Sequence, residues 1–433
     1  MSKKVLMVAS LFFVCLLTAG ESAGSGAVVA WGDNSENQCY VPSPNTDFIA
    51  VAGGVVHSLG LRGDGSVVAW GSNAHHQCDV PSPNTGFIAI AAGGWHSLGL
   101  KENGSVVAWG TNSSYQCDVP APNADFIAIA AGGWHSLGLK EDGSVVAWGD
   151  NFFHQCNVPL PNTGFIAIAA GKRHSVGLRS DGSVVAWGDN SDGQCTVPLP
   201  NTGFIAVAAG EYHTLGLKED GSIVGWGGNG LGQCAVPSPN TGFIGVAAGY
   251  FHSMGLKDDG RIIAWGDNAS NQCDVPFPNA GFIAIAAGPA HSLGIKAITG
   301  TVVVNVTPDT ASWTLTGPAG FEGNGQTYTG DRTFNNAPTG DYTWTGKALS
   351  GYTAPASETK TLAAGATITF TKTWTATGAG GGGGTVSGCP GKALLEGSQG
   401  VPDTAGAYPV GDLSLLVGTG VALTVFGRRR RRK

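Results

Sequence analysis

The chain has 433 residues, with 23 basic and 30 acidic side chains and 70 glycines. Eight basic residues lie in the terminal segments, so the body between them holds 15 basic and 30 acidic residues, a formal charge of about −15. Such a surface repels phosphate backbones, which excludes nucleic acid as an expected partner.

The N-terminus predicts a secretory signal at residues 1–20. Lys3 and Lys4 precede an apolar run over residues 5–17, and the small residues that end at Gly20 fit a cleavage site. The run is too short to span a membrane comfortably. We therefore expect an exported chain whose mature form begins near Glu21.

A 39-residue repeat organises residues 26–297. Tryptophan, cysteine and histidine each recur at this interval without insertion or deletion, which is typical of one supersecondary unit copied many times. The three series are Trp31, Trp70, Trp109, Trp148, Trp187, Trp226 and Trp265; Cys39, Cys78, Cys117, Cys156, Cys195, Cys234 and Cys273; and His57, His96, His135, His174, His213, His252 and His291.

Each copy predicts short β-strands. In one copy these are residues 66–70 (SVVAW), 87–92 (FIAIAA) and 96–100 (HSLGL), with a fourth, shorter edge strand at 77–80. Dipeptides such as Asp64-Gly65 fit tight hairpins. The VPxP segments are expected to connect the units, because proline cannot donate a ladder hydrogen bond.

Four strands in each of seven units predict a closed, seven-bladed, all-β propeller. An open stack would need atypical terminal repeats, and none is visible in the sequence. Closure is expected between residues 27–31 and residues 292–296. Residues 301–304 could compete for that place, so both pairings stay open.

The motif WGxNxxxQC followed by AAGxxHSLGLKxDG is similar to the repeats of regulator-of-chromosome-condensation-like proteins, over residues 26–297. The short, insertion-free form resembles the bacterial branch that includes a secreted propeller inhibitor of β-lactamases. This resemblance implies a seven-bladed propeller with a binding role, without naming the ligand. Nucleotide exchange on a small GTPase would be expected to use a protruding insertion, and seven copies of equal length contain none.

The repeated side chains are expected to be structural. Equivalent positions in neighbouring units differ by roughly a 51° turn, which keeps the cysteines beyond the ~7 Å that a disulfide allows, so we predict buried thiols. The histidines are expected to hold a neighbouring backbone group once per blade, because residues spread around a circle do not converge on a metal. The tryptophans are expected in the core.

Function is expected where the copies differ. The variable places are the pair before each histidine and the trio after each WGxN, both in loops that could share one face. Exposed aromatic and arginine side chains favour binding, whereas unselected drift would give small polar residues. In the inhibitor that the chain resembles, the matching pair carries aromatic contacts to the target. The predicted partner-binding residues are Trp95, Trp134, Lys172, Arg173, Glu211, Tyr212, Tyr250, Phe251, His75, His76, Tyr115, Phe152, Phe153 and His154.

Residues 300–375 predict a small β-sandwich. Strands are expected at 301–306, 312–316, 342–345 and 367–373, with Trp313, Trp344 and Trp374 able to seed its core. The segments GPAG and PTGDY weakly resemble bacterial PEGA-type or prealbumin-like domains, which act as spacers or adhesive units.

The remaining segments predict attachment to the cell surface. Residues 376–412 are a glycine-rich linker containing Cys389, and 413–433 join an apolar stretch to an arginine cluster. As a helix the stretch would span only ~21 Å of a ~30 Å hydrocarbon layer. This tail resembles bacterial C-terminal sorting signals, with Cys389 as the processing or lipid-attachment residue; a plain tail anchor is the alternative.

The sequence thus predicts a secreted, surface-attached, monomeric module that binds an unidentified protein through its variable loops. An extracellular inhibitor of the β-lactamase-inhibitor type, a glycan-binding lectin-like propeller and, as the least favoured, a nucleotide-exchange regulator are the alternatives. We expect no catalytic residue, no metal and no cofactor, and contact with the membrane only through the C-terminal tail.

Overall fold

The computed structural model describes residues 25–318, 321, 323–363 and 366–377. The helices and strands assigned in this part are all β-strands. No helix among the described residues is long and apolar enough to span a membrane. The predicted signal sequence with Gly20, the linker with Cys389 and the apolar C-terminal segment lie outside the described residues.

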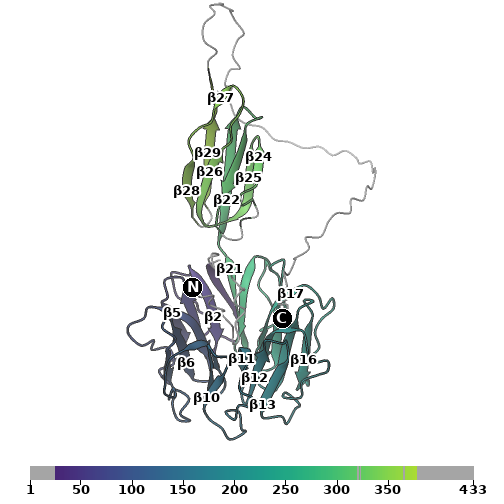
Figure 1. Ribbon diagram of the computed structural model, residues 1–433. Helices are drawn as coiled ribbons and strands as arrows, with labels where there is room; N and C mark the ends of the chain where they lie inside the picture. The colour runs from purple at the N-terminus through teal and green to yellow at the C-terminus, as the bar shows by residue number, and fades with distance from the viewer. Residues whose placement is uncertain (1–24, 319–320, 322, 364–365, 378–433) are drawn as a thin grey trace, which may run out of the picture. The chain divides into compact units, whose positions relative to one another are not determined.

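Residues 26–297 fold into repeated antiparallel units of three strands (Figure 1). In the first unit, β2 (Phe48–Gly53) pairs with β3 (His57–Arg62), which pairs with β4 (Val67–Gly71). The units that follow are β5 (Phe87–Ala92), β6 (His96–Lys101) and β7 (Val106–Gly110); β8 (Phe126–Ala131), β9 (His135–Lys140) and β10 (Val145–Gly149); β11 (Phe165–Ala170), β12 (His174–Arg179) and β13 (Val184–Gly188); β14 (Phe204–Ala209), β15 (His213–Lys218) and β16 (Ile223–Gly227); and β17 (Phe243–Ala248), β18 (His252–Lys257) and β19 (Ile262–Gly266).

The last unit combines the two ends of the repeat region. β20 (Phe282–Ala287) pairs with β21 (His291–Ala297), and β21 pairs with β1 (Gly26–Gly32) from the start of the chain. Ala27 lies opposite Lys296 and Trp31 opposite Ser292, which is the expected closure. The competing segment, residues 301–304, lies in a strand of the next domain.

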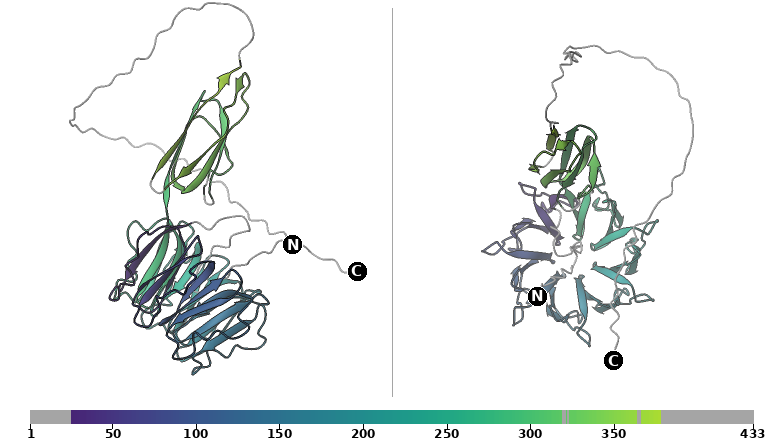
Figure 2. Two further views of the ribbon diagram at one scale, coloured as in Figure 1. Left: turned by 90° about the vertical axis from the view of Figure 1, so that its left-hand side faces the viewer. Right: turned by 45° about the horizontal axis from the view of Figure 1, so that its top comes forward.

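The units stand side by side around a closed circle. Strand β2 contacts both β5 and β20, and each following first strand contacts the next, from β5 through β8, β11, β14 and β17 to β20. Figure 2 shows this radial arrangement in its right-hand view. The ring therefore has no free end, which is how a propeller protects the edges of its sheets.

The predicted fourth strand is wrong, because residues 77–80 form turns and extended chain outside any sheet. The asparagine after each VPxP segment takes its place on the outer edge. Asn84 accepts a hydrogen bond from the backbone nitrogen of Val67 at 2.8 Å and donates one to the carbonyl oxygen of Val67 at 2.8 Å. One side chain thus supplies the two bonds of a ladder step, so the outer strand needs no partner there.

Each hydrophobic cluster of the ring is shared by two neighbouring units. Trp187 on β13 packs with Phe165 on β11 and with Leu137 and Leu139 on β9 of the preceding unit. Its indole nitrogen donates to the carbonyl oxygen of Gln155 at 2.9 Å. The predicted core role of the repeat tryptophans is therefore confirmed, and their burial stabilises contacts between units as well as within them.

The invariant glycine of the HSLGL strand makes room for the phenylalanine that begins each unit. A β-carbon on Gly177 would lie 2.5 Å from the ring of Phe165, closer than any real contact. Arg179, at the end of the same strand, places its guanidinium 5.1 Å from the centre of that ring. The phenylalanine is therefore enclosed by tryptophan, glycine and a cation, which explains why all of these positions repeat.

The domain that follows is a β-sandwich with its own core. One sheet has the order β25 (Arg332–Pro338), β22 (Thr299–Thr307) and β29 (Thr367–Thr373), with β22 and β29 parallel. The other has the order β24 (Thr327–Thr329), β23 (Ser312–Thr316), β26 (Gly340–Gly346) and β28 (Glu358–Leu362), and β27 (Tyr352–Thr353) pairs with β30 (Thr375–Ala376).

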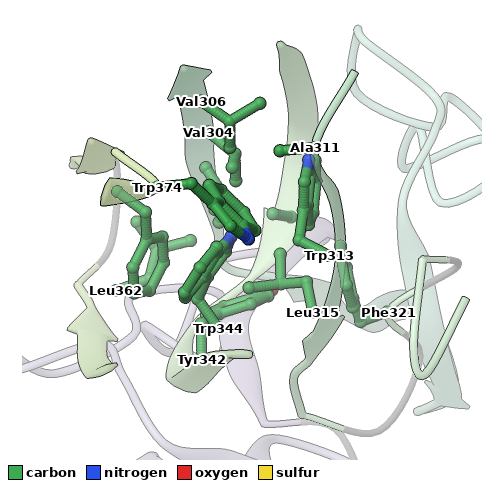
Figure 3. Packing of buried hydrophobic residues seen from close by; sticks show 13 residues of the cluster. Val304, Val306, Ala311, Trp313, Leu315, Phe321, Tyr342, Trp344, Leu362 and Trp374 are labelled. Carbon is green, nitrogen blue, oxygen red and sulfur yellow. The ribbon is translucent and has the colours of Figure 1, made fainter. Parts of the chain in front are cut away.

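The sandwich core forms around the three tryptophans that the sequence singles out (Figure 3). Trp313, Trp344 and Trp374 are all buried, and the rings of Trp344 and Trp374 meet edge to face at 5.5 Å. The indole nitrogen of Trp374 donates to the carbonyl oxygen of Lys347 at 3.0 Å. Four strands of the domain were predicted, corresponding to β22, β23, β26 and β29, and five were not: β24, β25, β27, β28 and β30.

Candidate binding face

The two variable loop sets lie at the same end of the units, which is the shared face that the sequence left possible. The backbone nitrogen of Ser72, in the loop after β4, donates to the carbonyl oxygen of Val56 at 2.8 Å. The equivalent bonds join Thr111 to Trp95 at 2.9 Å and Asp189 to Arg173 at 3.0 Å. We call this end the loop face. It comprises the pair before each histidine and residues 33–40, 72–79, 111–118, 150–157, 189–196, 228–235 and 267–274.

The repeat histidines hold the loop face on a closed ring of hydrogen bonds. His57 Nε2 lies 3.0 Å from Ser97 Oγ of the next unit, and the last bond of the circle joins His291 Nε2 to Ser58 Oγ at 3.0 Å. The predicted partner, a backbone group, is wrong: the partner is a side-chain hydroxyl. The remaining bonds are His96 to Ser136, His135 to Ser175, His174 to Thr214, His213 to Ser253 and His252 to Ser292.

The network also defines which histidine nitrogen carries the proton. Ser97 Oγ donates its hydrogen to the carbonyl oxygen of Gln77 at 2.8 Å, so it can only accept from His57 Nε2. Burial lowers the pKa of His57 to about 3, with a smaller contribution from the neighbouring His291. The ring histidines are therefore neutral donors. Each one holds a hydroxyl that in turn binds a backbone carbonyl of the loop face.

Within the described residues, no three His, Cys, Asp or Glu side chains converge on a metal position. The repeat cysteines are free thiols in this part of the chain, but they are half-buried rather than fully buried as predicted. The reason is their place in the surface loop, where Cys39 Sγ donates to the carbonyl oxygen of Asp33 at 3.2 Å. Burial raises the pKa of Cys39 to about 12, which disfavours the reactive thiolate.

The first residues of the variable pairs, except Glu211, lie around the axis of the ring. A narrow cavity there, with ≈ 40 Å³ available to water-sized molecules, is lined mainly by the repeated Ala-Gly segments. Val55, Lys172, Tyr250 and Pro289 also line it. Lys172 and Tyr250 therefore lie where the loop face meets the central cavity.

Residues of the variable pairs, together with residues of the loop trios, build three side-chain clusters on the loop face. In the first, Trp95 and Trp134 from neighbouring units lie with ring centres 4.7 Å apart. His75, from the loop after β4, meets Trp95 edge to face at 6.3 Å. Two sequence-distant variable sets therefore contribute to one aromatic surface.

The second cluster joins Arg173 to the loop after β10. The Arg173 guanidinium lies 4.7 Å from the centre of the Phe153 ring, a cation–π distance. Phe153 also contacts Phe152 at 5.0 Å between ring centres. Phe152 is 80% exposed, so this cluster presents a large apolar side chain directly to solvent.

The third cluster surrounds a buried ion pair. Lys172 Nζ contacts the carboxylate of Glu211, whose side chain is only 5% exposed. The same ammonium lies 5.2 Å from the ring centre of Tyr250 and 5.9 Å from that of Tyr212. Phe251 contacts Tyr212 at 6.1 Å and Tyr250 at 6.4 Å between ring centres.

Electrostatics in the third cluster favour a cation at its centre. A hydrogen bond to Glu211, with a smaller effect of burial, raises the pKa of Tyr212. Burial, followed by the charge of Glu211, raises the pKa of Tyr250. Both phenols therefore stay neutral, and the one full negative charge among them belongs to the Glu211 carboxylate.

Three predicted residues stay apart from these clusters. His76 pairs with Asp79 in its own loop at 2.8 Å, and His154 Nδ1 lies 3.1 Å from Asn157 Nδ2 in its own loop. Tyr115 is 70% exposed. All three occupy the third place of the trio, where the backbone is left-handed, with φ between 62° and 65°. Gly193 and Gly232 stand at this place in other copies, a signal that the sequence contained.

The prediction that the bulky pair residues are exposed is wrong for all of them. Trp95, Trp134, Tyr212, Tyr250 and Phe251 are half-buried because they pack against one another across units. Glu211 is buried, with 4% of its surface exposed. The loop face is therefore a preformed surface with restrained side chains, which lowers the entropy that a partner must overcome.

Sequence reasoning missed three exposed apolar residues at the variable place of the VPxP segments. Leu160 is 88%, Leu199 90% and Phe277 97% exposed. They lie toward the opposite end of the units, because the neighbouring Pro161 carbonyl accepts from Arg179 at the far end of β12. Comparison of the copies could have found them, since this place holds Ser, Ala, Leu or Phe.

The 39-residue repeat matches the model of a known repeat family. Six segments match the model of the regulator of chromosome condensation (RCC1) repeat: 48–77, 87–116, 126–155, 165–194, 204–233 and 243–272. Each runs from the first phenylalanine of a unit to the glutamine of the loop after its third strand. The seventh copy is divided between residues 282–297 and 26–38, which accounts for its absence from the matched set. No curated protein sequence matches the chain.

Solved structures resemble the chain at the level of fold. Prp20p from Saccharomyces cerevisiae, whose binding to Gsp1p and histones was studied, is 21% identical with a TM-score of 0.56, covering 64% of this chain and 93% of that one. Yeast RCC1 (Prp20) bound to Kap60 is 21% identical, with a TM-score of 0.56 and coverage of 68% and 94%. Human WBSCR16 is 17% identical, with a TM-score of 0.51 and coverage of 63% and 99%. Residues 26–297 therefore form an RCC1-like β-propeller.

Proposed function

We propose that the propeller is a protein-binding module and that the loop face is its binding surface. The observation that carries this proposal is the set of three side-chain clusters, built from variable residues on an otherwise uniform framework. Trp, Tyr and Arg are the residue types that dominate binding hot spots. Drift of unselected loop residues would not be expected to pair Trp95 with Trp134, or Arg173 with Phe153, across separate loops.

The fold adds support of a general kind. Prp20p, which has the same fold, is described by its binding to Gsp1p and histones, and yeast RCC1 (Prp20) was solved bound to Kap60. These partners belong to those proteins. For this chain they support only the class of function, a propeller that binds other proteins.

We also propose that the chain is exported, that the propeller has seven blades, and that the sandwich is a PEGA-like stalk between it and the C-terminal attachment segment. The signal-like residues 1–20 and the sorting-like tail from residue 376 support this proposal. Sequencing the N-terminus of the mature protein should find Glu21 first. Cys389→Ala should release the chain from the surface fraction into the medium, and unchanged fractionation would contradict the attachment.

The binding proposal is tested by partner capture with the full chain. A variant with Trp95, Trp134, Tyr212, Tyr250 and Phe251 all changed to alanine should lose partners that the wild type retains. Because these residues are half-buried, circular dichroism must first establish that the variant is folded. The matched control changes Leu160, Leu199 and Phe277 to alanine at the opposite end of the units.

The outcomes separate the alternatives. Loss of partners only in the loop-face variant supports the proposal, whereas identical partner sets for the wild type and that variant would exclude it. An activity assay of β-lactamase with added protein tests the narrower inhibitor function. A glycan array tests a lectin, for which the paired Trp95 and Trp134 rings would be the stacking platform.

A further inference from the structure

We propose that Glu211, Tyr212 and Tyr250 form a receptor for a lysine side chain of the protein partner, and that Lys172 is a resident occupant which the partner's lysine replaces. This inference rests on the proposed function and specifies the chemistry of the group that is recognised. We call the three residues the ammonium site.

The geometry of the ammonium site is that of a cation receptor. Two tyrosine rings lie 5.2 and 5.9 Å from the Lys172 ammonium, within the ~6 Å over which a ring face attracts a cation. The Glu211 carboxylate supplies the opposite charge. Aromatic rings around a carboxylate attract a positive charge by two independent effects, so the site would select an ammonium over a neutral side chain.

Burial explains why the site must always hold a cation. The Glu211 side chain is 5% exposed, and an unpaired carboxylate buried to this degree is strongly unfavourable. In the protein alone, the Lys172 ammonium supplies the cation that pairs with the Glu211 carboxylate. Its own side chain is 27% exposed, so it can leave toward solvent once another cation enters.

The surroundings favour a basic partner. Residues 26–297 contain 21 acidic and 10 basic side chains. Ten of these acidic residues but only two of the basic residues lie on the loop face. With histidine neutral, the loop face therefore carries a formal charge of −8. Its acids are Asp33, Glu36, Asp79, Asp118, Asp150, Asp189, Asp192, Glu211, Asp267 and Asp274, and its bases are Lys172 and Arg173.

A field of this sign concentrates and orients cationic partners before contact. Five of these acids are exposed: Glu36, Asp79, Asp118, Asp192 and Asp274. Asp192 adds its charge beside the ammonium site, where it contributes to raising the pKa of Tyr212. Lysine fits the site better than arginine does, because the present occupant is itself an ammonium on a four-carbon stem.

The test removes the resident occupant and adds one from outside. In the full chain, Lys172→Gln keeps a hydrogen-bond donor near Glu211 but removes the charge. A capped peptide with a single lysine should bind this variant at least about tenfold more tightly than the wild type, the size expected of a desolvated cation–π contact. The same peptide with norleucine should gain nothing. Ligand-observed NMR gives both dissociation constants.

A matched double variant tests whether the gain in affinity comes from the Glu211 carboxylate or from loosening of the loop. In Lys172→Gln/Glu211→Gln the pair is neutral on both sides, so the gain in lysine-peptide affinity should disappear. Lys172→Met serves as the second single variant if Lys172→Gln does not fold. An equal affinity of wild type and single variant for the lysine peptide would overturn the inference, as would an equal gain for norleucine.

Failure of this inference differs from failure of the proposed function. If the peptides do not discriminate but partner capture still depends on the loop-face aromatics, only the ammonium site is excluded. If capture is unchanged by the loop-face variant, the proposed function is excluded whatever the peptides show.

Discussion

The histidine ring and the loop face lie within a few residues of each other, yet they follow opposite rules. In the ring, each copy places the same neutral histidine against a hydroxyl of the next unit. On the loop face, the residue directly before each histidine changes from valine to tryptophan, arginine, tyrosine or phenylalanine. The ring therefore fixes the backbone so firmly that the neighbouring side chain can vary without loss of the fold.

The largest expected effect is acid unfolding through the ring. Burial lowers the pKa of the ring histidines to about 3 or 4, against about 6.5 in an unfolded chain. The unfolded state therefore binds more protons below pH 6.5, and stability that is complete above this pH is lost as the pH falls. The shifted carboxylates, such as Asp64 with its lowered pKa, act only near and below their ordinary value of 3.8.

Urea unfolding of the full chain between pH 7 and 5 measures this effect. The number of protons taken up on unfolding, obtained from the slope of stability against pH, should approach seven near pH 5, one for each ring histidine. His135→Gln keeps a donor for Ser175 and should lower the uptake by one. A stability independent of pH in this range would contradict the buried, neutral ring.

A smaller effect is expected from the glycine that accommodates the phenylalanine ring. Gly177→Ala places a β-carbon 2.5 Å from Phe165, so the unfolding free energy should fall by about 1–3 kcal/mol through overpacking. Gly230→Ala is the matched control on the loop face, where a new β-carbon meets nothing within 4 Å. Equal unfolding midpoints for the two variants in urea would show that the framework is no tighter than the loop face.

The smallest effect concerns the strained loop position. Tyr115 has a φ of 65°, a conformation that side chains with a β-carbon rarely adopt. Tyr115→Gly should raise the unfolding free energy by up to about 1 kcal/mol, because glycine adopts this backbone without strain. Thermal unfolding measures the change. Destabilisation would mean that the exposed tyrosine makes contacts that stabilise its loop.

The contrast between repeated and variable positions explains which parts of the fold could be predicted from the sequence. The 39-residue period predicted the three main strands, the closure of β1 on β21, the burial of Trp187 and the common face of the two loop sets. The strands follow from short apolar runs rich in branched residues, and the closure follows from the spacing of the copies. A fourth strand was expected because the sequence does not reveal that the Asn84 side chain provides its two ladder bonds.

The candidate site was predicted by residue but not by arrangement. Variation between copies pointed to Trp95, Trp134, Lys172 and Glu211, yet nothing in their spacing shows that Lys172 pairs with Glu211 or that the tryptophans contact each other. Side-chain directions depend on the turn of the ring between units. That turn brings residues 39 positions apart into contact, and it is a property of the closed fold.

Hydrogen–deuterium exchange of the full chain, with and without a captured partner, measures whether the loop face binds the partner. Binding should slow exchange in the loop-face segments, above all in residues 93–96, 132–135, 171–174, 210–213 and 249–252. Protection confined instead to the VPxP segments around Leu160, Leu199 and Phe277 would contradict it.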